Sequence, residues 1–276
     1  MFNKSVNILM FDGNPKGIVM CELSNWNGRV YKFSRTHLKE FLKRDDSEYT
    51  GVYFLFGKDD MNNDTVYVGE AEQISNRINQ HLKDKDYWTE VIVLLSKDNY
   101  LNKAHVKYLE HSFYKKAKDE DRAKLINNTV PTKSSVSEYD ESMLKEFFDN
   151  SLLLISLLGK KVFEHIADEI TTINNESMMY IKAIRGADAM GMLTSDGFVV
   201  FKDSQIASDT TKSISYSLLN LRNKLIEEKV IVDYKFTKDY LFTSPSLAAA
   251  IVMGRNANGR TEWRTKNKKT INDLES

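Results

Sequence analysis

Five residues between positions 53 and 110 have the side-chain chemistry of a site that cleaves phosphodiester bonds. Tyr53 ends a Gly-Val-Tyr triplet, Tyr67 opens a Tyr-Val-Gly triplet, and Arg77 follows ten residues later. His81 stands four residues beyond Arg77, and Glu110 comes later in the chain. Arginine binds phosphate oxygens, histidine transfers protons near neutral pH, and carboxylates hold divalent cations. Each residue alone is more often structural, so the hypothesis depends on the whole set.

The elements around these residues are predicted to form a small mixed sheet with helices packed on it. Strands are expected at 51–56, 65–69 and 89–95, and helices at 73–83 and 101–118. Ile74, Ile78 and Leu82 recur every four residues, which predicts one buried stripe on the first helix. Arg77 and His81 then point within about 40° of each other at the edge of this stripe.

Glu110 is predicted to lie at the border of a buried helix face. It falls beside Val106, Phe113 and Ala117, which share one side of the second helix. A carboxylate in this position loses solvation, so it needs either a partner or a metal ion. The helical pattern therefore predicts a half-buried acid.

The segments on either side predict further regions in a chain of the α+β class. Asn27-Gly28 between apolar-rich runs predicts a β-hairpin, and a helix is expected over 35–43. Later strands are expected at 178–184, 191–193 and 198–202, with helices at 140–159, 215–228 and 245–253. We therefore expect an N-terminal hairpin and helix over 1–48, a central domain over 49–165 and a second small α+β domain over 170–276, with the joint near 165–175.

The composition indicates a soluble protein with a packed core. Of its 276 residues, 41% are hydrophobic, one is cysteine, and basic and acidic residues are equal in number. A single cysteine excludes a disulfide framework, and neither a signal peptide nor a membrane-spanning run is visible, so a cytoplasmic location is expected. The net charge of zero argues against binding nucleic acid by charge alone, although a bound divalent cation would add positive charge.

The two triplets, with the arginine, histidine and helical glutamate that follow them, resemble the GIY-YIG nuclease superfamily over about residues 50–130. Valine replaces isoleucine in both triplets, which is a conservative change. The resemblance implies a three-stranded antiparallel sheet flanked by helices. It also implies a metal-dependent endonuclease that hydrolyses phosphodiester bonds in DNA. The family uses an asparagine late in the domain, and here Asn127 is the expected residue, with the adjacent Asn128 as the alternative.

The resemblance also implies a role for each residue of the set. Glu110 would hold one divalent cation, Mg²⁺ or Mn²⁺, and Arg77 would bind a phosphate oxygen in the transition state. Tyr53 would position or deprotonate the attacking water, and Tyr67 would complete the hydrogen-bond network. A phenol, with a pKa of about 10, needs a nearby cation such as Arg77 to act as a base. His81 is the alternative base, because its pKa lies near neutral pH.

Spaced motifs in the C-terminal third carry a second resemblance. They include Asp196-Gly197-Phe198, Ser244-Pro245-Ser246, Asn258-Gly259 and Trp263. This pattern resembles DUF4357, a domain of unknown function that often follows the nuclease domain, and it suggests a module that reads DNA. Basic groups suit phosphates and an aromatic ring suits bases. The expected nucleic-acid-binding residues are Arg255, Arg260, Trp263, Arg264 and Lys266. A solvated basic tail around a core tryptophan is the alternative.

Two other functions stay open at this point. One is a catalytically silent nucleic-acid-binding adaptor, against which the retained set of site residues argues. The other is an RNA-processing nuclease, because nothing in the sequence selects the sugar. The expected partner is DNA, either single- or double-stranded, and no membrane is expected. The sequence indicates neither the oligomeric state nor a choice among repair, restriction, phage defence and mobile-element maintenance.

Overall fold

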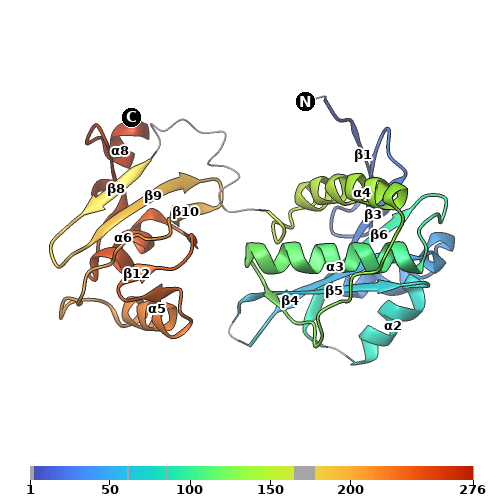
Figure 1. Ribbon diagram of the computed structural model, residues 1–276, viewed down its shortest axis with the longest axis horizontal. Coiled ribbons are helices and arrows are strands. Elements are labelled where there is room, and N and C mark those ends of the chain that lie inside the picture. Colours follow the sequence, from blue (N-terminus) through green and yellow to red (C-terminus); the bar gives the residue numbers. More distant parts are fainter. Residues whose placement is uncertain (1–2, 61, 85, 165–177, 276) are drawn as a thin grey trace. The chain divides into compact units, whose positions relative to one another are not determined.

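The computed structural model describes residues 3–60, 62–84, 86–164 and 178–275 (Figure 1). The chain divides into two compact units, Met1–Glu164 and His165–Ser276. The joint that the sequence predicts near 165–175 lies outside the described residues. Within the described ranges, no helix combines the length and the apolar character that crossing a membrane requires.

A seven-stranded sheet forms the centre of the first unit. The strand order is β1-β2-β3-β6-β4-β5-β7. The strands are β1 (Val6–Met10), β2 (Val19–Leu23), β3 (Gly28–Ser34), β4 (Gly51–Lys58), β5 (Asp64–Ala71), β6 (Trp88–Ser96) and β7 (Lys124–Leu125). Neighbouring strands are antiparallel, except that β7 pairs parallel with the first part of β5.

The middle of this sheet is buried on both faces because its strands are apolar at successive positions. In β6, Ile92 and Leu94 pack into the core on one face, and Val91, Val93 and Leu95 pack into the core on the other. All five side chains are fully buried. The nearly continuous apolar run therefore forms the central strand that the sequence predicts.

Helices cover both faces of the sheet. On one face lie α3 (Lys103–Glu120) and α4 (Glu138–Leu157), and on the other lie α1 (Leu38–Phe41) and α2 (Ile74–Asp84) (Figure 1). The long helix α3 has a defined start, because the side chain of Asn102 caps the backbone amides of Ala104 and His105. The expected α+β class is confirmed for this unit.

The N-terminal hairpin is not a separate extension. The predicted hairpin of β2 and β3 is present, but its connection is the segment 24–27 and Gly28 is the first residue of β3, so the turn does not fall at Asn27-Gly28. β3 also pairs with β6 from Gly28 to Ser34. The three strands expected from the sequence, β6, β4 and β5, are therefore adjacent strands of a wider sheet. The sequence pattern does not predict the added strands β1 and β7, because β1 lacks alternation of polar and apolar residues and β7 is very short.

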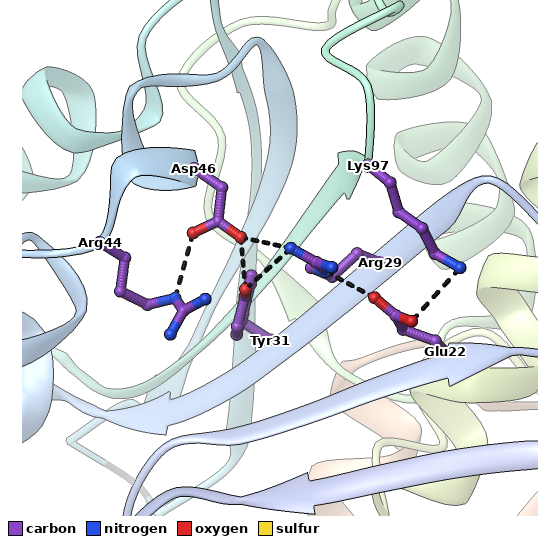
Figure 2. Close-up of polar contacts among 6 residues, drawn as sticks. All are labelled: Glu22, Arg29, Tyr31, Arg44, Asp46 and Lys97. Atoms are coloured by element: carbon purple, nitrogen blue, oxygen red, sulfur yellow. Dashed lines mark hydrogen bonds and ion pairs between the residues drawn. The ribbon is translucent and has the colours of Figure 1, made fainter.

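A buried carboxylate ties this hairpin to the segment that leads into β4. Asp46 lies in a single turn of 3₁₀ helix, η3 (Asp45–Glu48), and its side chain is 9% exposed. It accepts hydrogen bonds from the hydroxyl of Tyr31, from Nη1 of Arg29 at 2.8 Å and from Nε of Arg44 at 3.0 Å (Figure 2). The acid is thus fully partnered at the start of the strand that carries Tyr53.

The same network extends across the hairpin to a second acid. Nε of Arg29 donates to Glu22 at 2.6 Å, and Nζ of Lys97 lies 3.2 Å from the other oxygen of Glu22 (Figure 2). Arg29 therefore bridges two carboxylates from opposite sides. This alternation of charges holds β2, β3 and η3 together at one end of the sheet.

The second unit combines a five-stranded antiparallel sheet with helices. The sheet order is β13-β10-β9-β8-β14, and β11 pairs separately with β12. The strands are β8 (Met179–Lys182), β9 (Asp188–Thr194), β10 (Gly197–Val200), β11 (Ile231–Val232), β12 (Lys235–Phe236), β13 (Tyr240–Phe242) and β14 (Arg264–Thr265). The helices are α5 (Tyr216–Glu227), α6 (Pro245–Met253), α7 (Gly259–Glu262) and α8 (Ile271–Glu275).

The buried helix α6 organises the core of this unit. Ser244 caps its first turn by accepting from the amide of Leu247, and Pro245 occupies that turn. The helix ends at Gly254, whose φ of 63° belongs to the left-handed region. Residues 248–253 are all buried. The start and stop signals that the sequence predicts for this helix are confirmed.

Replacing Asp46 by Asn should lower the free energy of unfolding of the first unit by about 2–4 kcal/mol, because two arginines lose a shared buried charge. Burial alone would raise the pKa of Asp46, but Tyr31, Arg29 and Arg44 outweigh it and hold the pKa below its ordinary value. With the folded-state pKa depressed, this stabilisation is present above the unfolded-state pKa and is lost as the pH falls.

Urea unfolding at pH 7 and at pH 3 measures both effects. The difference between wild type and the Asn variant should shrink at pH 3. The exposed neighbour Asp45 provides the matched control, and Asp45→Asn should change little. Equal effects of the two substitutions at pH 7 would contradict a special role for Asp46.

Candidate active site

An open pocket of about 470 Å³ lies beside β5. Its position follows from the sheet, because β7 pairs only with Thr65 and Val66 and leaves the rest of that edge of β5 to other groups. The pocket is lined by Tyr67, Arg77, Gln80, His81, Asp84, Glu110 and residues 127–132. It thus brings together five of the six catalytic residues expected from the sequence, and Tyr53 is the exception.

Tyr53 is fully buried and bonds to the pocket residue His81. Its hydroxyl lies 2.7 Å from Nε2 of His81, which is also buried. The ring of Tyr53 faces Gly69 directly across the β4–β5 ladder, and a Cβ at position 69 would come within 2.4 Å of the hydroxyl oxygen. The second triplet therefore needs its glycine, because any larger residue would displace Tyr53.

The acid–base properties of Tyr53 make it a poor base. Burial raises the pKa of Tyr53 far above its ordinary value, the nearby hydroxyl of Tyr67 adds to this, and Arg77 opposes it without reversing it. Arg77 thus acts on this phenol in the expected direction, but in the protein alone it does not offset the effect of burial. A tyrosine that keeps its proton can still accept a hydrogen bond from Nε2–H of His81 and so orient the imidazole.

Arg77 lies between the tyrosines and the acid of the pocket. Burial by itself would lower the pKa of Arg77, but the hydroxyls of Tyr53 and Tyr67 act in the opposite direction and raise it. Its guanidinium also influences the titration of Glu110. Nη1 donates to Gln80 at 3.1 Å on the same helix. Arg77 therefore keeps its charge and presents it at the pocket, as a phosphate ligand must.

Glu110 has the half-buried position that its helical spacing predicts. Burial raises the pKa of Glu110 to about 7, and the nearby carboxylate of Glu70 adds to the effect, whereas Lys103, Arg77 and Lys107 oppose it. Within the described residues, the carboxylate of Glu110 forms no hydrogen bond or ion pair. Glu70, by contrast, is neutralised by Lys103 at 3.0 Å. Glu110 is thus a half-buried acid of this site that has no protein partner among the described residues.

Asn127 is fixed to the edge of β5. Its Oδ1 accepts from the amide of Val68 at 3.1 Å, and its Nδ2 donates to the carbonyl of Val68 at 2.7 Å. The side-chain amide thus continues the pairing that β7 begins. Asn128 also lines the pocket. Both asparagines therefore remain in the site, and Asn127 has a clear role in holding the loop 127–132.

The donor set fits a magnesium ion held by a single protein carboxylate. Among the described residues, no group of three or more His, Cys, Asp or Glu side chains could hold a metal by itself. Magnesium is commonly held by one or two carboxylates together with water and substrate phosphates. A half-buried carboxylate without a protein partner suits that arrangement, because a cation would compensate its lost hydration.

Gln80, Asp84 and the loop residues 129–132 also line the pocket but are not expected from the sequence. The signal for Asp84 is present, because it follows Arg77 by seven residues and therefore lies on the same side of α2. The loop has no such signal, since its place beside the pocket depends on long-range contacts, namely those of Asn127 with β5 and of the Pro131 carbonyl with His111.

The aromatic residue expected to bind nucleic acid in the second unit lies in its core. Trp263 is fully buried, its ring centroid is 4.4 Å from that of Phe198, and its Nε1 donates to the carbonyl of Pro245 at 3.0 Å. The indole is therefore closed to bases. Its neighbour Arg264 lies at the surface, because a charged side chain is rarely buried without a partner.

The basic residues around Trp263 fall into two groups. Arg255 bonds to Glu262 at 2.7 Å, and Arg260 bonds to Glu275 and to Asn272. The side chains of Arg264 and Lys266 are exposed. Neither forms a side-chain hydrogen bond or an ion pair in the part of the chain that the structure describes. The second pair is therefore the better candidate for phosphate contacts.

Comparison with known families identifies the second unit. Residues 179–275 match a domain of unknown function, DUF4357. The resemblance seen in the spaced motifs is thereby confirmed for this part of the chain. Neither the curated proteins nor the solved structures contain a significant match.

Glu110→Gln should stabilise the first unit at pH 8 by about 1–2 kcal/mol, a value reduced for partial solvent exposure. The pKa of Glu110 is raised from 4.5 to about 7, so the folded state prefers the protonated acid. The stabilisation from the bound proton is present below pH 4.5 and is lost as the pH rises through about 7.

Urea unfolding in the presence of a chelator, at pH 4.5 and pH 8, measures this difference. The gap between the variant and wild type should be small at pH 4.5 and should grow by pH 8. Glu70→Gln is the matched control, and it should destabilise because it breaks the ion pair with Lys103. A Glu110→Gln variant that is less stable than wild type at pH 8 would contradict the claim that the carboxylate of Glu110 has no stabilising partner.

Proposed function

We propose that the protein is a metal-dependent endonuclease of the GIY-YIG type that hydrolyses phosphodiester bonds, with DNA as its substrate. The observation that carries the proposal is the pocket in which Arg77, His81 and the unpartnered Glu110 converge. These residues come from two helices on opposite faces of the sheet. An adaptor that only binds nucleic acid has no need for a carboxylate whose ionisation is disfavoured.

The central sheet supports the same class of protein. Strands β4 and β5 carry the two triplets as direct neighbours, and β6 lies on the other side of β4. The helix with Arg77 follows β5, and the helix with Glu110 follows β6. This order agrees with the arrangement that the GIY-YIG resemblance implies, inside a wider sheet.

In the proposed reaction, Arg77 binds a nonbridging oxygen of the scissile phosphate and stabilises the charge that develops there. Glu110 would hold Mg²⁺, or Mn²⁺ in its place, and the bound ion supplies charge that polarises the phosphate. Tyr67 lies in the pocket and can orient water or a phosphate oxygen. The loop with Asn127 closes one side of the site.

We assign the base to His81 and an orienting role to Tyr53. His81 lines the pocket, whereas Tyr53 is buried and is not among the lining residues. Burial also raises the pKa of Tyr53, so this phenol keeps its proton at neutral pH. Accepting a proton requires a lone pair, and His81 has one at Nδ1 in the tautomer whose Nε2–H donates to the hydroxyl of Tyr53.

Glu110→Gln should reduce magnesium-dependent cleavage by at least roughly two to three orders of magnitude, because it removes the charge that holds the cation. The assay follows labelled single-stranded DNA, duplex DNA and RNA with magnesium, with manganese and with a chelator. Asp119→Asn is the matched control, since Asp119 is an exposed acid of the same helix outside the pocket, and it should retain activity.

The three substrates also separate the competing functions. Cleavage of RNA but not of DNA would show that the substrate is RNA. Binding without any cleavage would favour the catalytically silent adaptor. Wild-type turnover by a folded Glu110→Gln protein would remove Glu110 from the mechanism.

The second unit is proposed to supply affinity for DNA through Arg264 and Lys266. Replacing both by Ala should reduce the slope of log K against log salt by up to about two units, if each residue contacts one phosphate. The double variant of Arg255 and Arg260 is the matched control, because these residues are already paired with acids and should change the slope less. Equal slopes in all proteins would assign DNA binding to other surfaces.

A further inference from the structure

The outer edge of β1 is an unprotected strand edge. β1 lies at one end of the seven-stranded sheet and pairs with β2 on one side, and no other described strand pairs with it. Its residues Ile8, Leu9 and Met10 are 52%, 49% and 44% exposed. The strand contains no charged residue and no proline. Monomeric proteins usually protect such edges with these residues, because an open edge recruits another strand.

The hydrogen bonds to β2 show which backbone groups face outward. The amide of Ser24 donates to the carbonyl of Ser5 at 3.1 Å, and the amide of Phe11 donates to the carbonyl of Ile18 at 3.0 Å. In an antiparallel ladder, hydrogen-bonded positions alternate along the strand. The odd-numbered residues of β1 therefore bond to β2. The N–H and C=O groups of Val6, Ile8 and Met10 point to the open side.

We propose that a second copy of this chain pairs with β1, antiparallel, about a two-fold axis at Ile8. Two identical strands related in this way place residue 8 opposite residue 8 and residue 6 opposite residue 10. All of these positions have outward-facing backbone groups, so the edge is complementary to itself. The two sheets then join into one continuous sheet.

The charges at the two ends of the strand favour a second copy as the partner. Lys4 precedes β1, and Asp12 lies in the short 3₁₀ turn of residues 11–13 that follows it. The antiparallel pairing therefore brings the end of β1 with Lys4 near the end of the partner's β1 that leads to Asp12. Both side chains are exposed. Within the described residues, Asp12 forms no side-chain hydrogen bond or ion pair. Opposite charges at facing positions stabilise a strand pair, whereas like charges would oppose it.

Apolar surface on α4 extends the contact beyond the strand. Val6, Ile8 and Met10 pair with β2 residues of the α4 face, and Lys4 bonds to Asn150 of α4. On α4, Leu153 and Leu157 are 38% and 53% exposed and lie on the same side as Asn150. A specific dimer buries roughly 1,000 Å² or more, which a bare strand edge does not supply alone.

Cysteine cross-linking tests both the partner and the register. Ile8→Cys should form a disulfide-linked dimer on mild oxidation, because facing residues of a hydrogen-bonded pair have a Cα separation of about 5.5 Å, within the range of disulfides. Leu9→Cys alone should not, since residue 9 faces residue 7 of the other copy. An equal mixture of Asn7→Cys and Leu9→Cys should link. The native Cys21 is fully buried and serves as the background in the wild-type protein.

A proline substitution tests the backbone bonds separately. Ile8→Pro removes an outward-facing N–H and leaves the ladder to β2 intact, so it should give a folded monomer. Sedimentation velocity should show twice the chain mass for wild type and for the control Ile8→Val. A wild-type protein that stays monomeric at all concentrations, or a Leu9→Cys protein that links as well as Ile8→Cys, would overturn the proposal.

Discussion

The buried hydrogen bond between Tyr53 and His81 is the constraint on which the candidate site depends. It joins the middle of the sheet to α2, and because both side chains are buried, water is a poor substitute for either partner. The bond requires Gly69, because a side chain there would occupy the space of the phenol. Once α2 is docked in this way, Arg77 and His81 both reach the pocket, and the buried stripe of Ile74 and Ile78 supplies the apolar contact that keeps it there.

The site also depends on an incomplete strand pairing. β7 ends after Leu125. Beyond it, the side-chain amide of Asn127, and not its backbone, forms the hydrogen bonds to the backbone of Val68. The chain then leaves the sheet as the loop 127–132 and forms a wall of the pocket. A longer β7 would have continued along β5. The gap lets Glu110 on one face of the sheet share a pocket with residues from the opposite face.

Local patterns in the sequence predict much of this arrangement, and long-range pairing accounts for the rest. Helical spacing correctly places Glu110 at the border of a buried face and Arg77 beside His81 on one side of α2. The pairing of β3 with β6 joins segments about sixty residues apart, and no local pattern encodes it. Trp263 is a case in which local sequence misleads. Its basic neighbours suggest that the indole lies at the surface, but in the folded protein it lies in the core. The spacing of apolar residues predicts which face of a helix or strand is buried, but only the fold determines which residues that face contacts.

The electrostatics of the pocket disfavour the ionised form of Glu110. Glu70 and Glu110 approach from different elements, and Lys103 neutralises the first of them. Burial leaves the second with its pKa raised to about 7, so around neutral pH the cation that we propose would have to displace a proton from only part of the molecules. A fully paired Glu110 would be more stable and would bind a cation less well, since the cation would first have to displace the partner. In the proposed function, the stabilisation that this carboxylate forgoes in the protein alone would be recovered when a cation and a phosphate bind in the pocket.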